Sequence, residues 1–166
     1  TRQQGELATT WNAVPFRFGG YVSEVAPSER LRHAFVLRIA QWLPWNGALK
    51  GYYRLYFDDW GVVSQTVEAQ LAQRLSKDTF VRGEARFHRQ TSASFFTTRA
   101  IDLGRARTAD SDLADFSALT LGGSLVVDVH WRPLGTVRFD AGVARYVRSN
   151  DLSLYVATVG TEFVFD

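Results

Sequence analysis

The fold class is decided by the stretch from Leu119 to Trp131, whose sequence is LTLGGSLVVDVHW. Its odd-numbered positions are apolar residues or glycine, and its even-numbered positions are small or polar residues, except Val126. Successive side chains of a β-strand point to opposite faces, so this period of two predicts a strand with one apolar and one polar face. The stretch is also longer than the roughly five or six residues of a common globular strand.

The same alternation recurs through most of the chain and predicts an all-β protein of about eight strands. Residues 65–75 are rich in Ala, Leu, Gln and Glu, which would favour a helix. Their apolar residues nevertheless fall at Val67, Ala69, Leu71 and Leu75, so we predict a strand there as well. The predicted strands are 16–23, 31–43, 49–57, 65–75, 81–88, 119–131, 137–144 and 157–165.

Composition excludes several classes of protein. Hydrophobic residues make up 46% and charged residues 22% of the 166 residues, which excludes a disordered chain and fits a single domain, 1–166. Because the chain has no Cys, disulfides, thiolate metal sites and a Cys nucleophile are excluded. A net charge of +2 gives no reason to expect a nucleic-acid partner. The chain does not begin with Met and starts without an apolar run, so we expect any export signal to have been removed.

The connections between the predicted strands alternate in length. Short turns are predicted at 44–47, 76–78 and 132–135, and the first contains an Asn-Gly pair typical of hairpins. The intervening connections are 24–30, 58–61, 92–115 and 148–151, of which 92–115 is the longest. Outer-membrane barrels combine short periplasmic turns with longer outer loops. The alternation therefore predicts periplasmic termini and places 92–115 outside.

Aromatic residues gather at the ends of the predicted strands, as in the two girdles of a barrel in lipid. The closing Glu162-Phe163-Val164-Phe165-Asp166 is similar to the aromatic final strand of outer-membrane proteins, although Asp166 stands where an aromatic residue is commonest. The predicted girdle residues are Trp42, Trp45, Tyr56, Phe57, Trp60, Trp131 and Tyr146, with Phe95 and Phe96 near them.

These features together predict an antiparallel, up-and-down transmembrane β-barrel of the bacterial outer membrane. It would be built from about eight strands, or be the C-terminal strands of a larger barrel. Its expected partners are outer-membrane lipid, lipopolysaccharide and a periplasmic or outer-membrane protein. The alternative is a soluble, lipocalin-like barrel that binds a small apolar ligand, because alternation does not tell which face meets water.

Three segments add a resemblance to a known family. They are GYYRLYFDDWGV at 51–62, SQTVE at 64–68 and VRGEARFHRQ at 81–90. They resemble a family of bacterial outer-membrane proteins labelled as a domain of unknown function, DUF3570, whose members carry a similar Tyr-Arg-x-Tyr-x-Asp-Asp-Trp-Gly segment. The likeness is best over residues 50–100, and family members are usually longer. It implies a barrel and assigns no catalytic residue.

The polar faces of the predicted strands would line the lumen of such a barrel. Their cations outnumber their anions, which indicates an anion-favouring channel. The alternative is a plug of side-chain ion pairs, because eight strands leave little room for water. The predicted lumen residues are Lys50, Arg54, Glu68, Arg74, Arg82, Glu84, Arg86, His88, Asp128, His130, Arg138 and Asp140.

No pattern in the sequence requires catalysis, a metal or a cofactor, so none is predicted. His88, with Glu84 before it and Ser92 or Ser94 after it, suggests at most a lipid-modifying enzyme at the barrel rim. A calcium site would use carboxylates at 58, 59, 110, 112 and 115, but a solvated acidic loop is the preferred interpretation. Arg99, Arg105 and Arg107 are likewise predicted to be solvated.

Overall fold

A computed structural model describes residues 2–4, 13–131 and 135–164, and all regular secondary structure in them is β-strand. The prediction of an all-β, antiparallel protein is therefore confirmed. Within these residues, no helix is long and apolar enough to span a membrane. The three short strands are β1 (Arg2–Gln4), β2 (Ala13–Pro15) and β3 (Tyr21–Ser23), and the long ones are β4 (Glu29–Leu43), β5 (Gly47–Asp58), β6 (Val63–Ser76), β7 (Thr79–Gln90), β8 (Phe116–Trp131), β9 (Gly135–Arg148) and β10 (Ser153–Val164).

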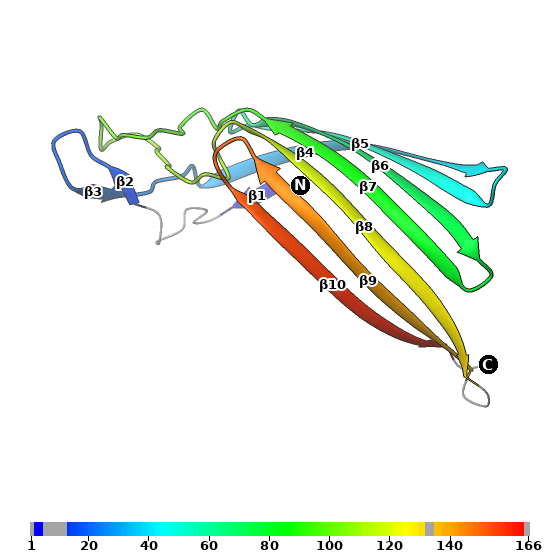
Figure 1. The fold of residues 1–166 in the computed structure, drawn as a ribbon. Coiled ribbons are helices and arrows are strands. Elements are labelled where there is room, and N and C mark those ends of the chain that lie inside the picture. The colour runs from blue at the N-terminus through cyan, green and yellow to red at the C-terminus, as the bar shows by residue number, and fades with distance from the viewer. Residues whose placement is uncertain (1, 5–12, 132–134, 165–166) are drawn as a thin grey trace. The chain divides into compact units, whose positions relative to one another are not determined.

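Eight strands form one sheet in the order β1-β4-β5-β6-β7-β8-β9-β10, and the long strands follow one another in sequence order (Figure 1). β1 and β10 are the edge strands of this sheet as far as the structure describes it. The ladders on both sides of β9 are long. β9 pairs with β8 from Ala118↔Arg148 to Trp131↔Gly135, and with the whole of β10 from Ser153↔Val147 to Val164↔Thr136. The strand predicted at 65–75 is confirmed as β6.

The turns follow from residues that tolerate unusual backbone angles. Asn46 has φ 60° in the turn before β5, and Gly61 has φ 85° in the turn before β6. Asp151, at φ 66°, lies in the turn between β9 and β10. A positive φ favours Gly, Asn and Asp, so these positions match their residue types. The predicted turn at 132–135 lies mostly outside the described residues.

One predicted strand is wrong. Residues 16–23 do not enter the large sheet; they contain a turn, with Gly19 and Gly20 at φ 102° and 76°, between β2 and β3. Two consecutive glycines in the left-handed region end the extended conformation, which the apolar alternation alone did not indicate. The strand that pairs with β4 on this side is instead β1, with a register from Arg2↔Leu31 to Gln4↔Glu29.

The chain divides into two compact units. The first comprises the described residues of 1–35, 54–65 and 89–116. Its buried side chains include Val14, Trp60 and Thr108. The β2–β3 hairpin pairs with the long 91–115 connection, because Arg17 N donates to Ala100 O and Val25 and Arg107 exchange two backbone hydrogen bonds.

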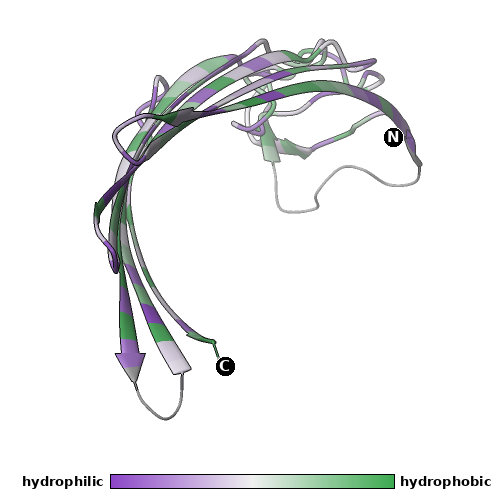
Figure 2. Cartoon of the chain, turned by 90° about the vertical axis from the view of Figure 1, so that its right-hand side faces the viewer, coloured by the Kyte–Doolittle hydropathy of each residue, from purple (hydrophilic) through white to green (hydrophobic). Residues whose placement is uncertain are grey.

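The second unit comprises 36–53, 66–88 and the described residues of 117–166, and its two sheet faces differ in exposure. On β8 and β9 most of the exposed residues belong to the apolar face, such as Leu121, Leu125, Phe139 and Val143, although Val137 on that face is buried. Most of the alternate residues of the same strands are half-buried or buried, with His130 exposed. Hydrophobic and hydrophilic bands alternate along the ribbons in Figure 2. This distribution is the reverse of that in a water-soluble sheet.

A glycine substitution tests the close strand spacing in the second unit. A Cβ on Gly142 would lie 3.0 Å from Ser124 Cβ and 3.0 Å from Thr158 Oγ1, its partners on both sides. We expect Gly142→Val to lower the free energy of unfolding by about 1–3 kcal/mol, through overpacking. Gly83→Val is the matched control, since nothing lies within 4 Å of its Cβ position. Urea unfolding of the purified protein measures both, and equal losses would contradict the packing described.

Candidate functional site

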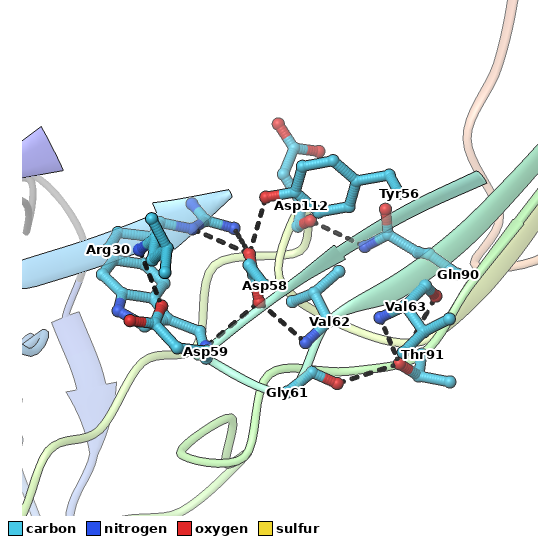
Figure 3. Close-up of polar contacts among 12 residues, drawn as sticks. Arg30, Tyr56, Asp58, Asp59, Gly61, Val62, Val63, Gln90, Thr91 and Asp112 are labelled. Atoms are coloured by element: carbon cyan, nitrogen blue, oxygen red, sulfur yellow. Dashed lines mark hydrogen bonds and ion pairs between the residues drawn. The ribbon is translucent and has the colours of Figure 1, made fainter. Parts of the chain in front are cut away.

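The turn after β5 is organised by one carboxylate, that of Asp58. Its Oδ2 accepts hydrogen bonds from Arg30 Nε and Nη2, at 2.9 and 2.6 Å, and from the Tyr56 hydroxyl at 2.6 Å (Figure 3). Its Oδ1 accepts the backbone N–H groups of Trp60 and Val62, at 3.1 and 3.0 Å. The side chain is fully buried. Asp58 therefore ties the β5–β6 turn to the start of β4.

Trp60 is buried in the same cluster, with 4% of its surface exposed. The Arg30 guanidinium lies 4.1 Å from its ring centroid, Phe95 packs against it edge-on at 5.0 Å, and its Nε1 donates to Glu29 O at 2.9 Å. Trp60, one of the predicted girdle residues, is therefore packed inside the first unit. Burial of the indole is compatible with its polar N–H because the Glu29 carbonyl accepts its hydrogen bond.

The same turn is also attached to the connection that follows β7. Thr91 Oγ1 accepts the N–H of Val63 at 2.9 Å and donates to Gly61 O at 3.2 Å, as Figure 3 shows. Gln90 Nε2 donates to the carbonyl oxygens of Asp112 and Ala114, both at 2.8 Å. The Asp-Asp-Trp-Gly segment thus has a folding role in this chain: it connects three separate segments of the first unit.

Two further predictions about loop residues need correction. Arg107, predicted to be solvated, is buried, and its guanidinium donates to the carbonyl oxygens of Ser23, Leu103 and Arg105 at 2.8–3.1 Å. Asp58, which the sequence analysis grouped with the solvated acidic loop, has a buried carboxylate that accepts five hydrogen bonds. Among the described residues, no group of three or more His, Asp or Glu side chains is arranged to hold a metal ion.

In the second unit, several of the predicted lumen residues contact one another across neighbouring strands. Glu68 of β6 lies 3.9 Å from Arg86 Nε on β7. Gln70 Nε2 donates to Glu68 Oε1 at 3.1 Å and to Glu84 Oε2 at 3.4 Å. His88 Nδ1 lies 2.9 Å from Thr66 Oγ1. Gln70 belongs to this network but was not among the predicted lumen residues. Strand alternation could have identified it, because it shares a face of β6 with Glu68.

A second network crosses β8, β9 and β10. The Arg138 guanidinium donates to both oxygens of Asp128, at 2.7 and 3.0 Å, and to Glu162 Oε2 at 3.4 Å. The ladder explains this contact, because Arg138 stands directly opposite both acidic residues. His130 Nε2 lies 3.7 Å from Asp78 Oδ1 in the turn before β7. These pairs leave Asp128 and Glu162 engaged with Arg138.

Other cations of the polar face lie over aromatic rings. The guanidinium of Arg74 is 4.8 Å from the ring centroid of Phe80, and in the first unit that of Arg54 is 5.6 Å from Tyr56. Arg38, which the sequence analysis did not select, is 5.6 Å from the centroid of Tyr52. A ring face attracts a cation without neutralising its charge. The polar face therefore keeps a positive excess that its carboxylates do not cancel.

Hollows lie on the polar side of the second unit's sheet. The hollow over β4–β7 has a volume of about 500 Å³, and the one over β7–β10 about 240 Å³. The first is lined by Arg38, Ile39, Ala40, Lys50, Gly51, Tyr52, Glu68, Gln70 and Arg86. The second is lined mostly by small residues, and its full lining is Arg82, Glu84, Gly123, Ser124, Asp140, Gly142, Val143, Ala144, Val156 and Thr158.

The remaining girdle residues divide between the two faces. Tyr56 donates to Asp58 and Tyr146 shares its strand face with Ala144 and Arg148, so neither lies on the apolar face. Trp42 is 80% exposed, and strand alternation places it on the side of Arg38. Trp45 is 59% exposed in the first short turn, and Phe57 stacks on Phe35. The side chain of the predicted girdle residue Trp131 lies outside the part of the chain that the structure describes.

Comparison with known protein families matches residues 8–161 to the family described as Protein of unknown function (DUF3570). The chain belongs to this family. The match extends the resemblance seen at 50–100 over nearly the whole chain. No match was found among curated proteins or among solved structures.

The Asp58 cluster can be tested by removing its carboxylate. We expect Asp58→Ala to lower the free energy of unfolding by about 3–5 kcal/mol, because Arg30 would keep a buried charge without its partner. The matched control is Asp59→Ala, which removes a single exposed hydrogen bond to Leu31 N and costs about 0.5–1.5 kcal/mol. Urea unfolding compares the two variants. Similar losses for both would show that Asp58 does not organise the turn.

Proposed function

We propose that this DUF3570 chain forms a β-barrel of the bacterial outer membrane, with its apolar face in lipid and its polar face around a solvated passage. The observation that supports this most directly is the distribution of exposure in the second unit. The apolar face of β8 and β9 is the more exposed one, including Leu121, Leu125 and Phe139. A broad exposed apolar surface marks a contact with lipid or with a partner.

Strand length and connections support the same proposal. A tilted membrane strand needs about 9–11 residues, and each strand from β4 to β10 has 12 to 16. The turns after β4 and β6 are short, whereas residues 91–115 connect β7 to β8. Outer-membrane lipid and lipopolysaccharide would be its surroundings, with the long connection on the outer side.

The soluble, lipocalin-like alternative requires the opposite distribution. A small apolar ligand would need a cavity lined mostly by apolar side chains. The hollow over β4–β7 instead presents the charged groups of Arg38, Lys50, Glu68 and Arg86. These side chains favour a passage for polar or charged solutes over a pocket for a hydrophobic one.

Fractionation of producing cells tests the membrane assignment. We expect the protein to sediment with the outer membrane, to require detergent for purification and to migrate differently on a gel before and after heating. A folded barrel resists detergent and keeps its compact shape until it is heated, which is the reason for the mobility shift. Recovery of a folded protein from the soluble fraction without detergent would contradict the proposal.

Two adjacent positions on β10 distinguish lipid from water around the apolar face. Val159, 86% exposed, lies on the apolar face near the middle of the strand, and exposed Thr158 lies on the polar face. In lipid, Val159→Arg should cost about 2–4 kcal/mol of folding free energy, and Thr158→Arg much less. In water, both substitutions of exposed residues should stay within about 0.5 kcal/mol. Unfolding in lipid vesicles measures the difference, and equal small effects would contradict lipid contact.

A further inference from the structure

We propose that the hollow over β4–β7 is a binding site for small polyanions that carry phosphate or carboxylate oxygens. This inference rests on the proposed function, because it specifies the solute class that the polar face of the barrel would select. Four consecutive strands contribute to the hollow: Arg38 comes from β4, Lys50 and Tyr52 from β5, Glu68 and Gln70 from β6, and Arg86 from β7.

The charges of this hollow do not cancel. Arg38, Lys50 and Arg86 supply three cations, whereas Glu68 supplies one carboxylate. That carboxylate is already engaged, because it lies 3.9 Å from Arg86 Nε and accepts the Gln70 amide at 3.1 Å. Neither Arg38 nor Lys50 forms an ion pair with any carboxylate of the described residues. An anion entering the hollow would therefore meet two cations that have no carboxylate partner there.

The orientation of Arg38 is suited to an oxyanion. Its guanidinium lies 5.6 Å from the centroid of Tyr52, so the aromatic ring restrains the side chain while leaving its N–H donors available. Lys50 adds a compact charge with three donors. Arginine binds planar oxygen pairs of carboxylates and phosphates through two parallel hydrogen bonds. The volume of about 500 Å³ leaves room for a small polyanion and some of its water.

The hollow over β7–β10 provides an internal comparison. It is lined by one cation, Arg82, and by two carboxylates, Glu84 and Asp140. Its charge balance is therefore negative, and its volume is about half that of the first hollow. The same polar face thus contains one hollow suited to anions and one that is not, which gives the experiment a control position.

Equilibrium dialysis of the purified full chain with inorganic pyrophosphate and with citrate tests the site. We expect saturable binding of at least one of these anions, weakened by added salt because charge attraction is screened. Lys50→Gln and Arg38→Gln should each raise the Kd roughly tenfold, the effect of losing one charged hydrogen-bond donor. Lys50→Arg, which keeps the charge, should bind nearly as well as the unsubstituted chain. A preference for pyrophosphate or citrate identifies phosphate or carboxylate as the favoured group.

Arg82→Gln is the control variant, since it removes a cation from the other hollow. An unchanged Kd in this variant together with weakened binding in Lys50→Gln would support the site. Absence of binding to both anions, or equal weakening in all three glutamine variants, would overturn it. The result is independent of fractionation: soluble protein with Lys50-dependent binding would contradict the membrane proposal alone, whereas an outer-membrane protein without binding would contradict the anion site alone.

Discussion

The register of the antiparallel ladder is the constraint on which the other features of this chain depend. In β8, β9 and β10 the pairs Asp128↔Arg138 and Glu162↔Arg138 place three charged residues side by side. The same register places Val127 opposite Phe139 on the other face. Because side chains alternate with a period of two, a slip of one residue would exchange the faces of a whole strand. Both the apolar surface and the polar networks would then be lost together.

The polar face built by this register is uneven. Over β5–β7 it carries long charged side chains such as Lys50, Arg74 and Arg86. Over β8–β10 the charged residues Asp128, Arg138 and Glu162 share it with small ones, namely Gly122, Ser124, Gly142, Ala144 and Thr158. Long side chains need space beyond their own strand, and small residues leave such space. A face of this kind combines ion-paired side chains with hollows.

The sequence predicted what is local and missed what depends on distant segments. The period of two identified β4–β10, and the Asn-Gly turn was found because its signal lies in neighbouring residues. The burial of Trp60 and Arg107 was missed because their partners, Glu29 and Ser23, are far away in the chain. On the polar face, alternation did not indicate which aromatic rings or carboxylates each cation would contact.

The strand order also determines the relative direction of β4 and β10. From β4 to β10 there are six steps between antiparallel neighbours, so these two strands run the same way. Direct pairing of β4 with β10 would therefore be parallel. If the sheet closed through antiparallel pairs alone, an odd number of further strands would have to lie between the outer edge of β10 and the outer edge of β4. β1 is antiparallel to β4 but pairs only with Glu29–Leu31, so in a closed sheet the remainder of the β4 edge and the outer edge of β10 would both need further partners.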